Sequence, residues 1–452
     1  MAAAFAARGF EIVGVDINQK SVDLVNEGKA PVQETDLDEL IFANKTRIRA
    51  TVSHEEAILN SDITFVIVPT PSDERGAFSL QYVEWAFTEI GKALVRKTGY
   101  HNVVLTSTVL PGSTREALLP VLEKASGKKV GRDIGLCYSP EFIALGSIIR
   151  NFLNPDFTLI GEFDEKCGKQ LEQCYAEVVE NQAPSVRMSL ENAELTKISV
   201  NTFVTTKISF ANMLADICEK LPGGDVDVVT EALGRDSRIG SKYLTGSIGY
   251  GGPCFPRDNV AFSFIAKQLG VDARLARASD SVNREIPAKF TDKILPLIRK
   301  GATVGVLGLA YKPFSHVTDE SQGLNIAIDL GKRGFRVVAF DPMSGEMEVD
   351  RMRRHIIIFD SLEECLKQSE VVLITTPDPV FAGLEPPDFK NEWSEIIVID
   401  FWRLLKDKLQ NAPGIKYIAV GRGEDDAAGR AKLKDLWVGK SDAKQVKASN
   451  EG

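Results

Sequence analysis

Residues 11–16, which read EIVGVD, are the stretch that decides the fold class of this chain. The apolar run indicates a buried β-strand, and an acidic residue ends it. In dinucleotide-binding folds a carboxylate at this point accepts hydrogen bonds from the adenosine ribose hydroxyls, so Asp16 favours NAD over NADP. An aspartate here can also begin a turn or cap the next helix. The segment therefore predicts an NAD-binding lobe that the rest of the chain must support.

Further strand-like runs alternate with helix-length segments, which predicts parallel sheets covered by helices. The first series is 12–15, 63–68, 103–105 and 134–137, and the second, after Pro287, is 303–307, 336–340, 371–375 and 396–399. Between them, residues 189–221 predict one long helix, because apolar residues recur near multiples of 3.6 at Phe203, Phe210, Leu214, Ile217 and Leu221. The predicted fold is α/β, with two Rossmann-like doubly wound lobes joined by a long central helix.

The start of the N-terminal lobe departs from this scheme. The Gly-rich turn that holds a dinucleotide pyrophosphate would precede residue 11, where the chain instead begins with the helical run AAAFAARG. Neither the first strand nor a GxGxxG motif is present, so this lobe is expected without its first strand. Either the coding start lies upstream of Met1, or the chain is a truncated form whose sheet lacks its central strand. The first is favoured, because loss of a central strand leaves two neighbours with unpaired backbone groups.

Composition narrows the possible partners. The net charge of −9 argues against a general nucleic-acid or membrane surface, and no apolar run approaches the roughly 18 to 20 residues of a membrane span. The six cysteines show no CxxC pair and no spacing to histidine typical of zinc, so neither a metal nor a disulfide framework is expected. A reducing cytoplasm and a small-molecule partner fit best.

Residues 249–258, which read GYGGPCFPRD, carry the densest chemical signal. Glycines let the backbone approach a ligand and prolines stiffen the loop, and between them lies the thiol of Cys254. A lone cysteine is more often a small buried hydrophobic residue, but a position between glycines and prolines favours a catalytic nucleophile. Earlier in the chain, Thr70 and Thr108 follow predicted strands and are placed to hydrogen-bond a cofactor, although either can be an ordinary turn residue.

At this loop the chain resembles the nucleotide-sugar dehydrogenases, the UDP-glucose, UDP-N-acetylhexosamine and GDP-mannose dehydrogenase family, whose signature is GFGGxCFPKD. Five other stretches resemble family motifs in the same order. They are SPEF at 139–142, ELTKI to Asn201 at 194–201, DSRIG at 236–240, GLAYKP at 308–313 and DFWR at 400–403.

The resemblance implies a function and a role for each motif. The enzyme would use NAD to oxidise the C6 alcohol of a UDP-sugar to the acid, as in polysaccharide biosynthesis, with Cys254 as covalent nucleophile. Glu141 would assist the water that releases the acid, and Lys197 and Asn201 would support the oxyanion. The implied substrate contacts are Phe142, Lys197, Asn201, Arg238 (reaching a neighbouring subunit), Tyr250, Gly251, Lys312 and Arg403, and Asp16, Thr70, Thr108 and Glu141 would line the cofactor site.

The residue chemistry agrees with these roles. Lys197 and Asn201 are four apart on a predicted helix and can present a cation and an amide to one oxygen, although a solvated polar stripe has the same spacing. Oxidation of an alcohol to an acid needs two hydride transfers, and a thiol prevents escape of the aldehyde between them. Glu141 or Asp258 would activate the water that hydrolyses the thioester, and Asp258 could instead orient the loop or Lys197. Thr108 is a further catalytic candidate.

The predicted domains are 1–188 for NAD, 189–287 as a central helical dimerisation domain with the cysteine loop, 288–423 for the UDP-sugar, and 424–452 as a mobile tail. A homodimer is expected because the central helix exposes more apolar face than the lobes need.

Two departures from the family keep alternatives open. Asp319 replaces an arginine of the family's Arg-Glu-Ser, which leaves the NAD affinity open, and IALG at 143–146 replaces the usual residues after PEF, which leaves the sugar preference open. One alternative is a single-step NAD-dependent hydroxyacid-type dehydrogenase, which shares the helical spine but needs no thiol. The other is an inactive nucleotide-sugar-binding homologue, suggested by the missing glycine turn and Asp319.

Overall fold

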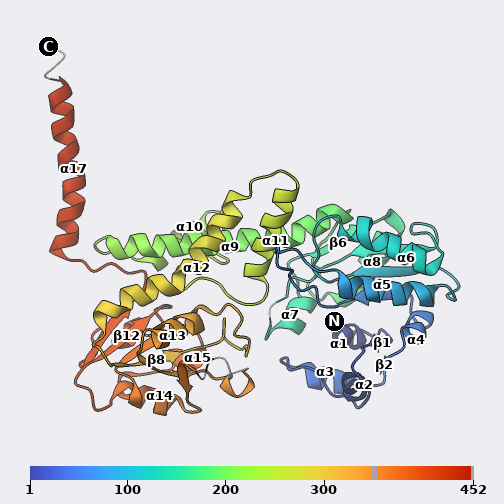
Figure 1. The fold of residues 1–452 in the computed structure, drawn as a ribbon, viewed down its shortest axis with the longest axis horizontal. Coiled ribbons are helices and arrows are strands. Elements are labelled where there is room, and N and C mark those ends of the chain that lie inside the picture. Colours follow the sequence, from blue (N-terminus) through green and yellow to red (C-terminus); the bar gives the residue numbers. More distant parts are fainter. Residues whose placement is uncertain (144, 348–351, 353, 449–452) are drawn as a thin grey trace. The chain divides into compact units, whose positions relative to one another are not determined.

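The computed structural model describes residues 1–143, 145–347, 352 and 354–448, with side chains described as far as residue 437. The chain forms two compact units (Figure 1). Unit 1 comprises residues 1–201 and 257–273, and unit 2 comprises residues 202–256 and 274–452. The predicted division at residues 188, 287 and 423 stays a prediction.

Unit 1 is built mainly of alternating strands and helices. Its elements are α1 (Ala2–Ala7), β1 (Ile12–Val15), α2 (Gln19–Asn26), α3 (Leu37–Ala43), β2 (Ile48–Thr51), α4 (His54–Leu59), β3 (Ile63–Val66), α5 (Gln81–Leu94), β4 (His101–Leu105), the π-helical turn η1 (Ser113–Leu118), α6 (Leu119–Ser126), β5 (Ile134–Tyr138), α7 (Ile148–Leu153), β6 (Thr158–Glu162), α8 (Glu165–Val178) and β7 (Ser185–Ser189). Helix α9 (Leu190–Lys220) begins in this unit, and most of α11 (Phe255–Gln268) belongs to it.

The strands of unit 1 form two separate sheets. β1 and β2 pair in parallel with each other, while the second sheet has the order β3-β4-β5-β6-β7. Among the described residues, β1 pairs only with β2, and β3 pairs only with β4. The four strands predicted for this lobe pair in parallel with their neighbours in that series or with β2, whereas β6 lies beyond the predicted series. β5 and β6 are antiparallel, because the chain from β5 returns through the short helix α7 instead of a full crossover.

Unit 2 holds the second doubly wound lobe. Its strands are β8 (Thr303–Leu307), β9 (Arg336–Phe340), β10 (Ile356–Ile358), β11 (Val371–Ile374), β12 (Ile396–Asp400) and β13 (Ile415–Ala419), and its helices are α10 (Val226–Arg235), α12 (Arg274–Ile294), α13 (Gln322–Lys332), α14 (Leu362–Gln368), α15 (Pro379–Ala382), α16 (Lys406–Leu409) and α17 (Ala427–Ala448). Short 3₁₀ turns lie at Leu295–Leu297, Ser344–Glu346 and Pro386–Phe389.

The sheet of unit 2 has the strand order β10-β9-β8-β11-β12-β13, and all its pairs are parallel. The chain order therefore reverses between β8 and β11, which is where open α/β sheets bind ligands. Residues on β8 and β11 that face each other are apolar and buried, for example Val304 with Val371. This burial on both faces explains why the sequence showed continuous apolar runs.

The long central helix is confirmed, since α9 spans 31 residues where the sequence predicted residues 189–221. The tail differs from expectation. The sequence predicts an aperiodic, mobile segment after residue 424, but α17 covers most of it. Alanine, lysine and leucine there have high helix propensity, which needs no amphipathic period. Mobility of the tail stays a prediction.

Candidate active site

In unit 1, the predicted cofactor contacts from β3 and β4 lie together at the carboxyl ends of those strands. Thr70 is buried, and its Oγ1 donates a hydrogen bond of 2.8 Å to the backbone oxygen of Thr108. The Ser107 hydroxyl fixes the same two loops, since it accepts from the Val68 N–H at 2.8 Å and donates to the Val68 oxygen at 2.7 Å. The two loops therefore form one hydrogen-bonded edge.

Asp16 follows β1 and is exposed, as a ribose-binding carboxylate must be. Its Oδ1 accepts a hydrogen bond of 2.8 Å from the Asn18 N–H, so it also begins a turn. The residues for the adenosine ribose (Asp16) and for the strand-end edge (Thr70, Thr108) thus fit a dinucleotide.

A second group in unit 1 gathers around α9. The Lys197 Nζ donates a hydrogen bond of 2.5 Å to the Glu141 backbone oxygen, and it lies 4.5 Å from the centre of the Phe142 ring. One turn later, the Asn201 Nδ2 donates to Asp258 Oδ2 at 2.6 Å. The predicted oxyanion pair thus shares one face of α9, with the SPEF loop and α11 beside it.

The two carboxyl groups here have perturbed acidity. Burial raises the pKa of Glu141 to about 7, although the Met1 amine and Lys197 partly offset this effect. Burial also raises the pKa of Asp258, against the opposing effects of Asn201, Lys197 and Arg257. A carboxyl group with a pKa near 7 suits general base catalysis at neutral pH. Asp258 accepts a hydrogen bond from Asn201, whereas the sequence suggested that it would orient the loop or Lys197, so its role stays a prediction.

In unit 2, Cys254 lies in the Gly-rich loop and immediately precedes α11. It is exposed, whereas the five other cysteines are buried. The loop depends on its glycines. Gly252 has a φ of +83°, and a Cβ there would lie 2.6 Å from the ring of Tyr311. Burial, together with the nearby Cys254 thiol, raises the pKa of Tyr311. The loop at residues 249–254, called the thiol loop below, is therefore packed closely against the loop that carries Lys312.

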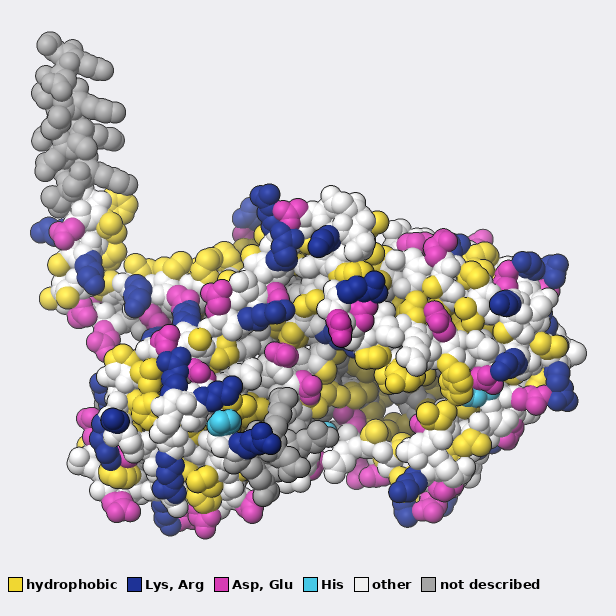
Figure 2. All heavy atoms as spheres, in the orientation of Figure 1, with side chains coloured by type: hydrophobic (Ala, Val, Ile, Leu, Met, Phe, Trp, Pro, Cys, Tyr) yellow, Lys and Arg dark blue, Asp and Glu magenta, His cyan; other side chains and the backbone are white. Residues whose placement is uncertain are grey.

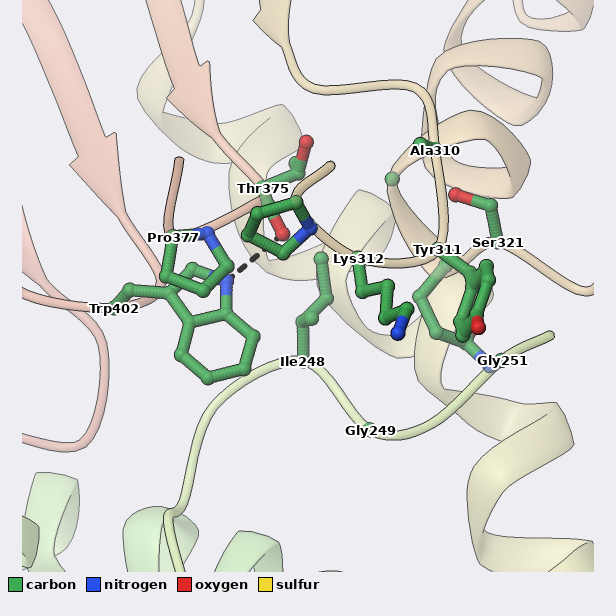
Figure 3. A pocket seen from close by; sticks show the side chains of 13 residues that line it. Ile248, Gly249, Gly251, Ala310, Tyr311, Lys312, Ser321, Thr375, Pro377 and Trp402 are labelled. Atoms are coloured by element: carbon green, nitrogen blue, oxygen red, sulfur yellow. Dashed lines mark hydrogen bonds between the residues drawn. The ribbon is translucent and has the colours of Figure 1, made fainter. Parts of the chain in front are cut away.

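A pocket in unit 2 lies at the reversal point of the sheet. Its lining residues are Ile248, Gly249, Gly251, Ala310, Tyr311, Lys312, Pro313, Ser321, Gln322, Gly323, Thr375, Pro377 and Trp402. Figure 3 shows the Lys312 side chain between the aromatic wall made by Trp402 and the loop at Gly251. The Trp402 Nε1 donates to the Thr375 oxygen at 2.8 Å, which fixes the indole ring. A cation and a fixed aromatic surface suit a nucleotide.

Arg403, which the sequence assigned to the substrate, is used otherwise in the structure. Its Nε and Nη2 bond both carboxylate oxygens of Asp227 on α10, at 2.7 and 2.8 Å, and its Nη1 donates to the oxygens of Phe401 and Val420 at 2.9 Å. Only 2% of the side chain is exposed. Within the DFWR stretch it is Trp402 that lines the pocket. Substrate binding by Arg403 therefore has no support in this geometry.

Arg238 lies in an exposed loop after α10, where its guanidinium pairs with Asp236 at 2.6 Å. This position is open to a neighbouring molecule, so its predicted role stays a prediction.

Sequence reasoning missed three residues that shape the site. Asp341 follows β9 and accepts hydrogen bonds from the N–H groups of Leu309 and Ala310, at 2.7 and 3.0 Å, so it orders the loop that leads to Lys312. Asn283 and Gln322 bond the thiol loop. The position of Asp341 at a strand end was a usable signal, but no local pattern distinguishes Asn283 or Gln322.

Two absences hold for the described part of the chain. It contains no group of three or more His, Cys, Asp or Glu side chains that could hold a metal ion. No described helix is long and apolar enough to cross a membrane.

The two lobes, the long helix and the thiol loop define a dehydrogenase that acts on a nucleotide-linked substrate. Three family models match consecutive parts of the chain. They are the NAD binding domain (residues 1–179), the central domain (191–285) and the UDP binding domain (305–407) of the UDP-glucose/GDP-mannose dehydrogenase family. The chain belongs to this family. It is an NAD-dependent oxidoreductase, and its membership of this family decides against the hydroxyacid-type alternative.

Individual relatives and solved structures agree with this family assignment. The chain is 37% identical to UDP-glucose 6-dehydrogenase AglM of Haloferax volcanii, over 90% of this chain and 94% of that protein. It is 32% identical to the GDP-mannose 6-dehydrogenase of Pseudomonas aeruginosa, over 85% and 90% respectively. Among solved structures, a UDP-glucose dehydrogenase from Pyrobaculum islandicum superposes with a TM-score of 0.83 at 32% identity, covering 93% of this chain and 94% of that one.

The Arg403 geometry leads to a stability prediction. Arg403→Met keeps the aliphatic stem but leaves two carbonyl groups and Asp227 without their donor, so the free energy of unfolding should fall by roughly 2–4 kcal/mol. Thermal and urea unfolding measure this, and UDP affinity should stay within about twofold. A tenfold loss of UDP affinity with unchanged stability would instead restore Arg403 as a nucleotide contact.

Proposed function

We propose that this enzyme oxidises the C6 alcohol of UDP-glucose to the acid in two steps, with Cys254 holding the substrate between them. One observation carries the proposal: Gly249 and Gly251 of the thiol loop line the same pocket as Lys312. If Lys312 binds the diphosphate of a nucleoside diphosphate sugar, the sugar lies beside the loop that carries Cys254. UDP-glucose is preferred because AglM and the Pyrobaculum protein bear that name.

The thiol would act on the aldehyde formed by the first oxidation. Cys254 lies at the N-terminal end of α11, where the helix dipole stabilises a thiolate. The thiolate adds to the aldehyde carbon and gives a thiohemiacetal, and the second oxidation converts this to a thioester. NAD, when bound, accepts the electron pair and proton that leave the substrate carbon in each oxidation, with Asp16, Thr70 and Thr108 as the residues that would hold it.

Polar side chains of unit 1 would stabilise the negative charge that forms on the substrate oxygen and would activate water for hydrolysis of the thioester. Lys197 and Asn201 donate hydrogen bonds from one face of α9 and would stabilise the negative oxygen of the hemiacetal. Asp258 would hold the Asn201 amide in the donating orientation. Glu141 would remove a proton from the water that cleaves the thioester, which releases the acid and restores the thiol.

The stoichiometry of NADH tests the function. With UDP-glucose, UDP-N-acetylhexosamines and GDP-mannose as a panel, the accepted substrate should give two NADH per sugar consumed. Cys254→Ser should release no acid, because no thioester forms. One NADH per sugar with a fully active C254S would contradict the proposal, and no NADH with any sugar would favour an inactive binding homologue.

The pH dependence tests the role of Glu141. The base works only when ionised, so the rate of acid release should fall about tenfold for each pH unit below the pKa of about 7. Glu141→Gln should lower this rate by about 10²–10⁴-fold and remove that inflection. The dependence of kcat on pH, measured for the parent protein and for E141Q, tests this prediction. An unchanged inflection in E141Q would assign the base to another group.

We further infer that two copies of the chain pair through α9. Phe203, Phe210 and Ile217 are spaced by seven residues, hence on one face, and are 67%, 46% and 46% exposed. Met213 on α9 and Val228 on α10 extend the apolar surface. Figure 2 shows hydrophobic side chains along the edge that α9 and α10 occupy in Figure 1. A patch of this kind usually marks an interface.

A cytoplasmic location stays a prediction.

Charge on this face should disrupt the pairing. The double variant Phe203→Asp, Phe210→Asp should sediment at a lower mass than the parent protein, because two buried carboxylates are costly in an apolar interface. Leu269→Asp, at an exposed apolar residue beyond α11, is the matched control and should leave the mass unchanged. The inference fails if the parent chain sediments as a monomer or if the double variant keeps the parent's mass.

A further inference from the structure

The backbone of Tyr250, in the middle of the thiol loop, is bonded on both sides by one side chain. The Tyr250 N–H donates to Asn283 Oδ1 at 2.9 Å, and the Asn283 Nδ2 donates to the Tyr250 oxygen at 2.9 Å. An amide side chain is able to do this because it carries both an acceptor and donors. Asn283 thus pairs with Tyr250 as a neighbouring strand would, although none of the strands that the structure describes includes Tyr250 or pairs with it.

The surroundings make this contact specific. Asn283 belongs to α12 and is only 4% exposed. Gly249 has a φ of +95°, and a Cβ there would lie 2.5 Å from Asn283 Oδ1, so the approach requires glycine. On the other side of Tyr250, the Gly252 N–H donates to the Asp319 oxygen at 2.8 Å. The conformation of the loop is therefore set by groups outside it.

Gln322 adds a second tether that also faces the nucleotide pocket. As first residue of α13, it donates from Nε2 to the Tyr250 oxygen at 3.0 Å. Its side chain is 6% exposed and lines the pocket near Lys312, and within the described residues its Oε1 is buried without a hydrogen-bond partner. A hydroxyl or N–H group of a bound nucleotide sugar would satisfy that oxygen.

We propose that Asn283 is a positioning residue that sets the place of Cys254 by fixing the Tyr250 backbone, and that Gln322 ties the same point to the bound nucleotide sugar. The proposal rests on the proposed function, in which Cys254 is the nucleophile. A loop with glycine at 249, 251 and 252 has little conformational preference of its own, so its order depends on these bonds. Misplacement of a reacting atom by about 1 Å can cost about 10²-fold in rate.

Loss of the Asn283 amide should act on kcat and not on KM. Asn283→Leu should lower kcat at least tenfold, while KM for the nucleotide sugar stays within about threefold. Gln322→Leu should lower kcat less and raise KM, because Gln322 also faces the pocket. Ser279→Ala is the matched control. Ser279 is buried one turn earlier on α12 and bonds Thr206 instead of the thiol loop, so both constants should be unchanged.

The thiol itself gives a readout that needs neither substrate nor cofactor. Because the other five cysteines are buried, iodoacetamide under native conditions reports on Cys254, and C254S supplies the blank. Asn283→Leu should slow alkylation at least threefold at pH 7, since the thiolate loses its fixed place at the N-terminal end of α11.

Asn283→Asp separates positioning from general stability. When protonated, the introduced carboxyl group accepts from the Tyr250 N–H and donates to the Tyr250 oxygen, as the amide does; when ionised, it can only accept. Burial raises the pKa of such a group. The ratio of N283D to wild-type kcat should therefore approach one at low pH and fall as the pH rises, which also keeps the test valid if N283L does not fold.

The outcomes distinguish the two levels of the account. If C254S retains full turnover, the proposed function fails. If C254S is inactive but the Asn283 variants keep wild-type kcat and alkylation, or if the N283D ratio is flat with pH, then only the positioning role fails.

Discussion

The hydrogen bonds between the Asn283 side chain and the Tyr250 backbone are the constraint on which the reactive part of unit 2 depends. The thiol loop needs glycine so that it can approach Tyr311 and Asn283 closely, and glycine removes the steric preferences that would otherwise order a loop. Order comes instead from α12 and α13, which are anchored in the core of the unit. A flexible sequence is thereby held on rigid elements, as a nucleophile requires.

A similar arrangement recurs in unit 1. Lys197 and Asn201 project from one face of α9, and each is engaged by a loop or helix beside it, through the Glu141 oxygen and the Asp258 carboxylate. At the end of β9, Asp341 takes the place of a ribose-binding carboxylate but bonds backbone N–H groups, so the second lobe uses the dinucleotide scaffold to order the Lys312 loop. The aspartate that follows the strand is thus available for a ribose in the first lobe, at Asp16, but orders a loop in the second lobe, at Asp341.

Most of the fold and the chemical residue types could be predicted from sequence, because they depend on local patterns. Buried strands are continuous apolar runs, and the long helix has a clear period. The antiparallel β6 and the surroundings of Arg403 and Trp402 were not predictable in this way. Each depends on residues distant in the sequence: the inward turn of Arg403, with a φ of +60°, is explained by Asp227, which is 176 residues away. Asn283 was missed for the same reason.

The most direct test of the central claim is to trap the substrate on the thiol. The E141Q variant, mixed with UDP-glucose and NAD, should accumulate the thioester because its hydrolysis is slowed. After an acid quench, mass mapping should find the nucleotide-sugar adduct on the peptide that contains Cys254, and hydroxylamine should release it as the hydroxamate. Formation of two NADH per sugar with no adduct at Cys254, or with an adduct on another residue, would contradict the account.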